Sequence, residues 1–243
     1  MRSTAVIVLA ACLVSQAVLP RAAAGQTADE LNRKGMSLYE RREYDEALKY
    51  FELAFTTDSR HHLAHYNYAC TAALLLARDY CWYMQLVSPL FEHLAEAVRL
   101  NPPLRQHMAT DPDLDVVRRK YRFQVVAGPD PQVPDDLRKI LTGLTWYGPQ
   151  PGALPASPVV SFELDGTVVI QETVVSDQGS PRDVTTHGTY RIEAGTAGLK
   201  IRVQTKTSAG RTTMIEAILR DGVIVLPGGE IPSLTDSASE CGA

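Results

Sequence analysis

A proline-rich stretch near the middle of the chain separates two parts with different residue patterns. Residues 128–134 read Gly-Pro-Asp-Pro-Gln-Val-Pro, and proline at this density favours a stiff, extended connection. Before this stretch, apolar residues recur at helical spacing. After it, runs rich in Val, Thr, Ile and Tyr alternate with polar residues, as in strands. We therefore predict an α+β protein with a helical domain at 27–126, a linker at 127–135, an antiparallel β domain at 136–232 and a flexible tail at 233–243.

The first 24 residues predict an export signal that is removed from the mature protein. Arg2 precedes an apolar run from Ala5 to Val14, and Ala22 and Ala24 occupy the −3 and −1 positions of a small-residue cleavage site. The run is too short to cross about 30 Å of hydrocarbon. We expect cleavage after Ala24 and a periplasmic or secreted mature chain with no membrane span.

A second interpretation of the same region stays open. Leu9-Ala10-Ala11-Cys12 matches the lipobox of bacterial lipoproteins, in which the cysteine receives a lipid. The two alternatives predict different products, a mature chain that begins at Gly25 or a lipid adduct on Cys12.

Export would place the remaining three cysteines, Cys70, Cys81 and Cys241, in an oxidising compartment. Their odd number requires at least one free thiol or an intermolecular bridge. With Cys70 in the middle of a helix and Cys81 just after its end, the helical rise of about 1.5 Å per residue separates the two by roughly 10 Å. Bonded cysteines need Cα atoms within about 7 Å of one another. We therefore expect no Cys70–Cys81 disulfide and a buried Cys70.

The helical part begins with a pattern that predicts two antiparallel helices of about a dozen residues each. The apolar positions run from Ala28 to Ala54, with a turn at Glu40–Glu43. Gly35 and Ala47 are small where the two helices would approach one another closely.

A second unit starts near His62, where Ala69 takes the place that Gly35 has in the first unit. Its second helix carries Leu90, Leu94 and Ala97. Residues 79–88 interrupt the spacing, and we interpret them as an apolar, aromatic insert that lies on another surface. Residues 109–123 predict a helix that caps the array, with Asp111 at its start and the basic residues Arg118, Arg119, Lys120 and Arg122 complementing the dipole at its end.

The small and large positions of both units resemble the tetratricopeptide repeat (TPR), a helix-turn-helix of about 34 residues. In that family the groove lined by the first helices binds peptides or protein segments. The resemblance does not extend to the carboxylate-clamp subtype, whose lysine and second asparagine fall on Asn32 and Met36. By resemblance, the residues that line a partner-binding groove here are Asn32, Met36, Tyr39, Leu63, Tyr66, Cys70 and Leu74.

The β part predicts an antiparallel meander that curls into a half-barrel or a sandwich. Short turn signals such as Asp165-Gly166 and Asp221-Gly222 separate the strand-like runs. These runs are Leu144–Tyr147, Val159–Leu164, Thr167–Val175, Thr186–Glu193, Leu199–Thr207, Thr212–Leu219 and Val223–Leu226. Alternation assigns Phe162, Leu164, Tyr190, Ile192, Ile201 and Val203 to the inner face.

Four short stretches of this part resemble small lipocalin-like bacterial domains over about 90 residues. They are residues 143–146, 162–167, 188–190 and 219–222. The resemblance implies a barrel that could enclose an apolar ligand. The large inner-face side chains instead favour a filled interior without a deep pocket.

Charge and motifs argue against nucleic-acid binding and catalysis. Lys plus Arg number 24 against 28 Asp plus Glu, which leaves a net charge of −4 and no strong basic field for a nucleic-acid backbone. The sequence contains no Gly-rich phosphate loop, nucleophile elbow or His-Glu-x-x-His. We expect a protein that is not an enzyme and that uses no cofactor.

Two clusters resemble metal sites only superficially. His61 and His65 stand four residues apart, but His65 takes a helix-packing position while His61 and His62 precede the helix. The series Asp111, Asp113, Asp115 lacks the glycine and the bidentate glutamate of a calcium loop. We expect no metal at either cluster.

The sequence thus predicts an exported adaptor that holds another envelope protein or peptide in a TPR groove. The alternative is a lipocalin-like carrier of a small apolar ligand or lipid, with the helices as its docking part.

Overall fold

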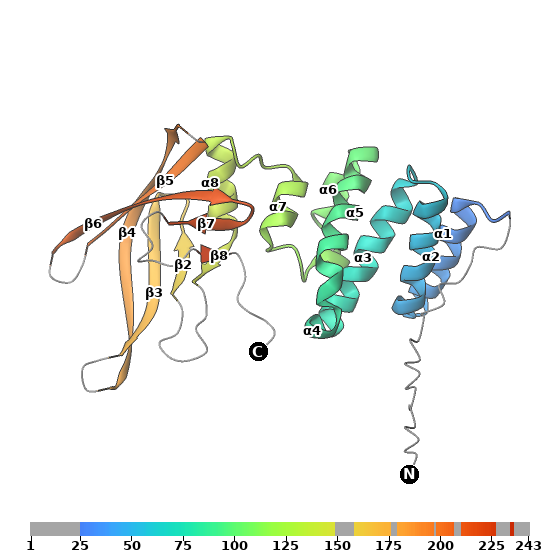
Figure 1. Ribbon diagram of the computed structural model, residues 1–243, viewed down its shortest axis with the longest axis horizontal. Helices are drawn as coiled ribbons and strands as arrows, with labels where there is room; N and C mark the ends of the chain where they lie inside the picture. The colour runs from blue at the N-terminus through green and yellow to red at the C-terminus, as the bar shows by residue number, and fades with distance from the viewer. Residues whose placement is uncertain are drawn as a thin grey trace, which may run out of the picture.

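The computed structural model describes residues 25–148, 158–175, 179–196, 198–206, 210–226 and 234–235. The predicted export signal, Cys12, Cys241 and all of the predicted tail except 234–235 lie outside the described residues. A helical N-terminal part leads into an antiparallel sheet that curls into a half-barrel (Figure 1). The α+β fold class is therefore confirmed, and of the two predicted forms of the sheet the half-barrel is the one observed.

Two helical hairpins form the N-terminal part and stand side by side (Figure 1). The first consists of α1 (Ala28–Glu40) and α2 (Tyr44–Thr57), and the second of α3 (His62–Arg78) and α5 (Val87–Leu100). A capping box starts α1, because the Thr27 hydroxyl accepts from the Glu30 amide while the Glu30 carboxylate accepts from the Thr27 amide.

The first hairpin is held together at one close contact between its helices. A Cβ atom added to Gly35 on α1 would lie 2.5 Å from Cε1 of Phe51 on α2. Phe51 and its neighbours on the same face, Ala47 and Ala54, are fully buried. The predicted close approach of the two helices at Gly35 is therefore confirmed.

The insert between α3 and α5 folds as α4 (Tyr80–Tyr83) and the 3-10 turn η1 (Met84–Leu86). Tyr80, Tyr83 and Leu86 pack half-buried against the core of the second hairpin. Trp82 and Met84 are 73% and 56% exposed, so the expectation that the insert lies on another surface is wrong for these two residues. A single short helical turn can bury only the side chains on the face toward the core. Trp82 and Met84 lie on the opposite, solvent-exposed face.

The predicted capping helix is replaced by α6 (Leu104–Met108), the 3-10 turn η2 (Pro112–Leu114) and α7 (Tyr121–Ala127). Asp111 caps η2 by accepting from the Asp113 amide at 3.1 Å. The Arg118 guanidinium donates to the carbonyl oxygens of Met108, Ala109 and Asp111. Arg118 thus stabilises a turn. The predicted continuous helix over 109–123 does not form, so the predicted role of Arg118 at the end of that helix is wrong.

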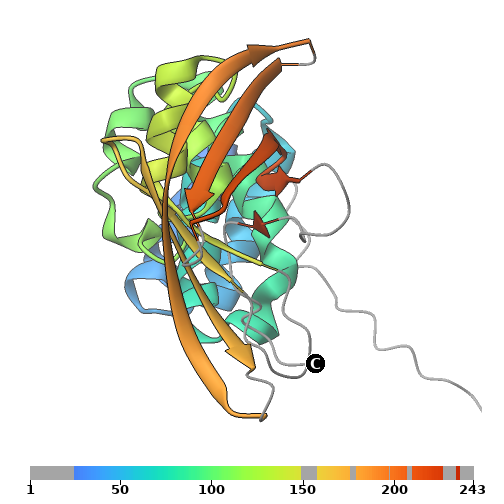
Figure 2. The same cartoon turned by 90° about the vertical axis from the view of Figure 1, so that its left-hand side faces the viewer.

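The C-terminal part begins with α8 (Pro134–Gly143), which starts within the stretch predicted to be linker. The described residues of this part form eight strands, each paired antiparallel with the next, and one residue pair, Tyr147 and Thr235, joins β8 back to β1 at the ends of the curled sheet. The strands are β1 (Thr145–Tyr147), β2 (Val159–Phe162), β3 (Thr167–Val175), β4 (Pro181–Gly195), β5 (Gly198–Lys206), β6 (Thr212–Arg220), β7 (Val223–Val225) and β8 (Leu234–Thr235). Figure 2 views the sheet end of the molecule, with the long, bent strands in front of the helices.

Aromatic side chains and α8 fill the concave face of the sheet. Trp146 is fully buried, and its indole nitrogen donates to the Leu141 carbonyl oxygen at 3.1 Å. Phe162 and Tyr190 pack edge to face with ring centroids 5.0 Å apart. The apolar face of α8 joins this core through Leu137, Ile140 and Leu141.

Most of the predicted inner-face residues take part in this core. Phe162, Tyr190, Ile201 and Val203 are buried and Ile192 is half-buried. Leu164 is 71% exposed, so its assignment to the inner face is wrong. The reason is that β2 ends at Phe162 and a turn follows, in which the Gly166 amide donates to the Glu163 carbonyl oxygen.

The two parts of the molecule meet where α7 contacts the β6–β7 turn. Gly222 in this turn has a φ of +81°, and a Cβ atom there would lie 2.9 Å from Cδ1 of Tyr121 on α7. Tyr121 also packs half-buried against the core of the sheet. A cavity of about 150 Å³ beside this contact is lined by residues of both parts, among them Phe91 and Asp221.

Cys70 is a buried free cysteine and Cys81 is disulfide-bonded. The prediction that these two are not bonded to one another, and that Cys70 is buried, is therefore confirmed. Within the described residues, no helix has the length and apolar character needed to cross a membrane.

Replacing Gly35 with alanine should destabilise the protein by about 1 to 3 kcal/mol, because the added methyl group overlaps the buried Phe51 ring. The overlap outweighs the gain of roughly 1 kcal/mol that alanine brings inside a helix. The measurement is the free energy of unfolding in urea. Phe51→Leu supplies the control, since the double variant should lose less than the sum of the two single variants. Additive losses would show that the two positions do not touch.

Candidate functional site

A groove of about 240 Å³ opens between the first helices of the two hairpins and the segment that follows α5. We call it the helical groove. Leu63 in its lining is exposed, whereas Tyr66, Cys70 and Asp111 are buried, and we call these three, together with Asp113, the floor of the groove. The lining residues are Met36, Tyr39, Leu63, Tyr66, Asn67, Cys70, Leu104, His107, Asp111 and Asp113.

The structure brings five of the seven predicted groove residues together in this lining, namely Met36, Tyr39, Leu63, Tyr66 and Cys70. Asn32 is buried instead, where its side-chain oxygen accepts from Asn67 Nδ2 at 3.0 Å. Leu74, one turn beyond Cys70 on α3, is half-buried and is not part of the lining.

These residues differ widely in accessibility. Leu63 is 44% exposed, and Met36 and Tyr39 are half-buried. Tyr66 and Cys70 are buried and belong to the core of the second hairpin. A substitution at Tyr66 therefore disturbs the core as well as the groove, whereas Leu63 reports on the groove surface.

The second wall of the helical groove comes from residues that sequence reasoning did not place there. Leu104 and His107 lie on α6, and Asp111 and Asp113 lie at the start of η2. The sequence signal for this wall is the run of alternate aspartates at 111–115.

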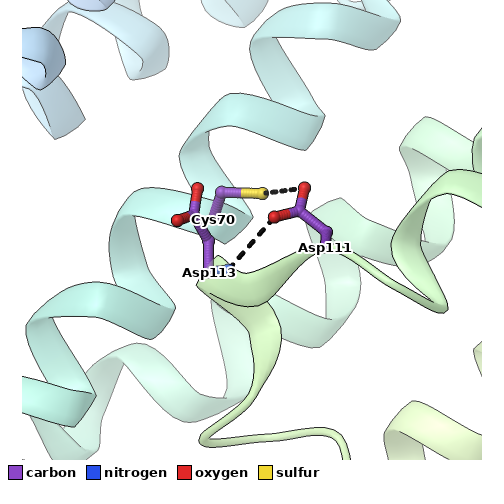
Figure 3. Close-up of side chains that lie close together, drawn as sticks. All are labelled: Cys70, Asp111 and Asp113. Atoms are coloured by element: carbon purple, nitrogen blue, oxygen red, sulfur yellow. Dashed lines mark hydrogen bonds between the residues drawn. The ribbon is translucent and has the colours of Figure 1, made fainter.

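Hydrogen bonds tie this wall to the first helices. Asp111 Oδ2 accepts from the Tyr66 hydroxyl at 2.7 Å and from the Cys70 thiol at 3.7 Å. Asp113 Oδ2 accepts from the Tyr39 hydroxyl. Figure 3 shows the Cys70 thiol of α3 pointing toward Asp111, with Asp113 beside it.

Burial controls protonation in this network. It raises the pKa of the Tyr39 and Tyr66 hydroxyls and of the Cys70 thiol, so that all three remain protonated donors. Burial also raises the pKa of Asp113, and the neighbouring Asp111 charge acts in the same direction, while the hydrogen bond from Tyr39 opposes them.

Cys70, Asp111 and Asp113 place three ligand atoms within 4.8 Å of one another, close enough to meet around one metal ion. A cysteine binds metal as the thiolate. Burial keeps the Cys70 thiol protonated and directs it to Asp111. The arrangement therefore favours a hydrogen-bonded cluster over a metal centre.

The predicted histidine cluster separates into different contacts. His61 caps α3, with Nδ1 accepting from the Ala64 amide at 3.0 Å, and its Nε2 lies 2.9 Å from Asp29 Oδ1. His65 is buried between Phe55 and His93, and its Nε2 donates to the Ser59 carbonyl oxygen at 3.0 Å.

His93, which sequence reasoning missed, pairs with His65. Since Nε2 of His65 carries the proton, its Nδ1 accepts from His93 Nδ1 at 2.9 Å. Burial, and then the neighbouring His65, lower the pKa of His93 to about 4. This pair links α3 to α5, and among the described residues no third His, Cys, Asp or Glu stands close enough to form a metal site with it.

The chain matches no known protein family, no curated protein and no solved structure.

Replacing Tyr66 with phenylalanine should lower the free energy of unfolding by about 1 to 3 kcal/mol, because the buried Asp111 carboxylate loses a hydrogen-bond donor. Urea unfolding measures the loss. Tyr44→Phe is the matched control, since no described residue accepts a hydrogen bond from the Tyr44 hydroxyl, and it should change stability by less than about 0.5 kcal/mol. Equal effects at the two positions would contradict the structural role of the Tyr66 hydroxyl.

Acid should destabilise the protein through His93. Its pKa falls from 6.5 to about 4 on folding, so the unfolded chain binds the proton more tightly. The stabilisation is complete above pH 6.5 and is lost as the pH falls toward 4, by about 1 to 2 kcal/mol after allowance for solvent screening. Urea midpoints at pH 7 and pH 5 test this. His93→Gln should flatten the profile, whereas the exposed His187→Gln should leave it unchanged.

Proposed function

We propose that this chain is an exported adaptor that binds a segment of another envelope protein in the helical groove. The observation that carries the proposal is an open, mainly apolar groove formed by the first helices of two hairpins. In TPR proteins the first helices of the repeats also form the groove. We therefore propose that the helical part of this chain is related to TPR proteins.

The size of the groove supports a protein segment as the ligand. Pockets for drug-sized molecules measure about 300 to 1,000 Å³, whereas the helical groove measures about 240 Å³. It can hold one or two side chains of a longer segment. The exposed Leu63 and the half-buried Met36 offer apolar contact at its rim.

The state of the cysteines supports export. Disulfides persist in oxidising compartments and are rare in the bacterial cytosol. Cys81 is disulfide-bonded, and residues 1–24 have the pattern of an export signal. A periplasmic or secreted location accounts for both.

Binding is favoured over catalysis by the chemistry of the groove floor. A nucleophilic cysteine needs a lowered pKa. Burial, and then the negative charge of Asp111, raise the pKa of the Cys70 thiol. The hydroxyls and the thiol act as donors that hold the two carboxylates in place.

The filled half-barrel supports the adaptor over the lipocalin-like carrier. Trp146, Val168 and Ile201 are fully buried on the concave face, and α8 covers them. Side chains of this size occupy the volume that an apolar ligand would need. We therefore propose the sheet as a packed partner of the helices.

Site-specific photo-cross-linking in the native envelope tests the groove as the docking surface. A photoreactive residue at Leu63, which lines the groove, should give a discrete adduct with a partner protein. The same residue at Leu164, which is exposed on the β part, is the matched control and should not give that adduct.

Affinity for the captured partner then provides a second measurement. Leu63→Asp should weaken binding by about tenfold or more, as expected for loss of an apolar anchor worth 1 to 2 kcal/mol. Leu164→Asp should leave the affinity unchanged. Both side chains are exposed, so both variants should fold. The same adducts and affinities at both positions would contradict groove binding.

A further inference from the structure

The lining of the helical groove contains acidic side chains but neither lysine nor arginine. Asp111 and Asp113 lie at its floor, next to one another. The one basic ring in the lining is His107, whose Nε2 lies 3.5 Å from Asp111 Oδ2. The His107 side chain is 63% exposed, and no other basic side chain lines the groove.

The donors that reach these carboxylates from the helices are neutral. The Tyr66 hydroxyl and the Cys70 thiol donate to Asp111, and the Tyr39 hydroxyl donates to Asp113. Asp113 Oδ1 receives no hydrogen bond from the described residues. Hydrogen bonds of this kind satisfy lone pairs but do not neutralise charge, and a poorly hydrated carboxylate gains most from a cationic partner.

The rest of the lining suits the stem of a long basic side chain. Met36, Leu63 and Leu104 are apolar and can cover methylene groups. The Tyr39 and Tyr66 rings offer aromatic contact to a cation. A guanidinium group adds planar, forked donors, which match a pair of carboxylates better than a single ammonium group does.

We propose that the helical groove accepts a basic side chain, arginine in preference to lysine, from an otherwise apolar peptide segment, with its charged head between Asp111 and Asp113. The inference rests on the proposed function, since it names the chemistry of the segment that the groove binds. The inference excludes acidic segments as the preferred ligand, because a carboxylate from the segment would be repelled by the charges of Asp111 and Asp113.

A displayed library of random twelve-residue peptides, selected on the full chain from Gly25 and counter-selected on Leu63→Gln, which removes the apolar contact without adding charge, supplies the probe. We expect the selected peptides to share one arginine or lysine flanked by apolar residues. Replacing that arginine by citrulline, which is neutral and nearly isosteric, should weaken binding at least tenfold in calorimetry or fluorescence anisotropy.

Protein variants test the same contact from the other side. Asp113→Asn keeps an acceptor for Tyr39 but removes the charge, and should weaken peptide binding at least tenfold. Glu40→Gln is the matched control, because it removes one negative charge from an exposed position on α1 outside the groove, and affinity should stay within twofold.

His107→Lys keeps the test decisive if Asp113→Asn does not fold. It places a permanent cation beside Asp111 from an exposed position, and should weaken the arginine peptide at least tenfold while the thermal unfolding midpoint is kept. Unchanged affinity in this variant would overturn the inference.

Three other outcomes separate the inference from the proposed function. Selected peptides that are neutral or acidic, or a citrulline effect below twofold, would overturn the basic ligand but leave groove binding intact. Peptides that bind wild type and Leu63→Gln alike would overturn both. Displacement of the arginine peptide by stoichiometric zinc chloride, with loss of Cys70 reactivity, would assign the carboxylates to a metal ion instead and overturn the inference.

Discussion

Two tyrosine–aspartate hydrogen bonds fasten the segment that follows the second hairpin to the first helices of both hairpins. Tyr66 holds Asp111 and Tyr39 holds Asp113, so the start of η2 is fastened to α3 and α1 at once. Hydrogen bonds to charged groups contribute about 1.5 to 3 kcal/mol each. The same bonds form the floor of the helical groove, which means that stability and the proposed binding depend on one set of side chains.

The elements that the sequence predicted well are those whose pattern is local. The helices α1 and α2 follow from apolar spacing and small residues, and β3 has the predicted bounds of Thr167–Val175 because alternation and flanking turns define it on their own. The capping segment follows from contacts made far along the chain. The Arg118 guanidinium holds this turn by donating to backbone carbonyl oxygens up to ten residues away. The spacing of apolar residues in the sequence gives no indication of such a contact. The helix α8 was hidden because a proline such as Pro134 is typical both of a linker and of a first helical turn.

The same distinction applies to the candidate site. The positions on α1 and α3 could be predicted because their spacing resembles a known repeat. The opposite wall required knowledge of how α6 and η2 return to these helices. Cys70 was interpreted as a small apolar residue, and its environment is indeed buried, but its contact with Asp111 spans 41 residues. His65 was correctly assigned to packing, while its partner His93 lies 28 residues away on another helix.

The contact between Tyr121 and Gly222 has a mechanical consequence. The ring of Tyr121 lies so close to the glycine that no side chain could stand between them, and it also reaches the core of the sheet. Such a contact resists sliding and rotation of one part on the other. A protein segment bound in the helical groove, as we propose, would therefore be held close to one orientation relative to the half-barrel.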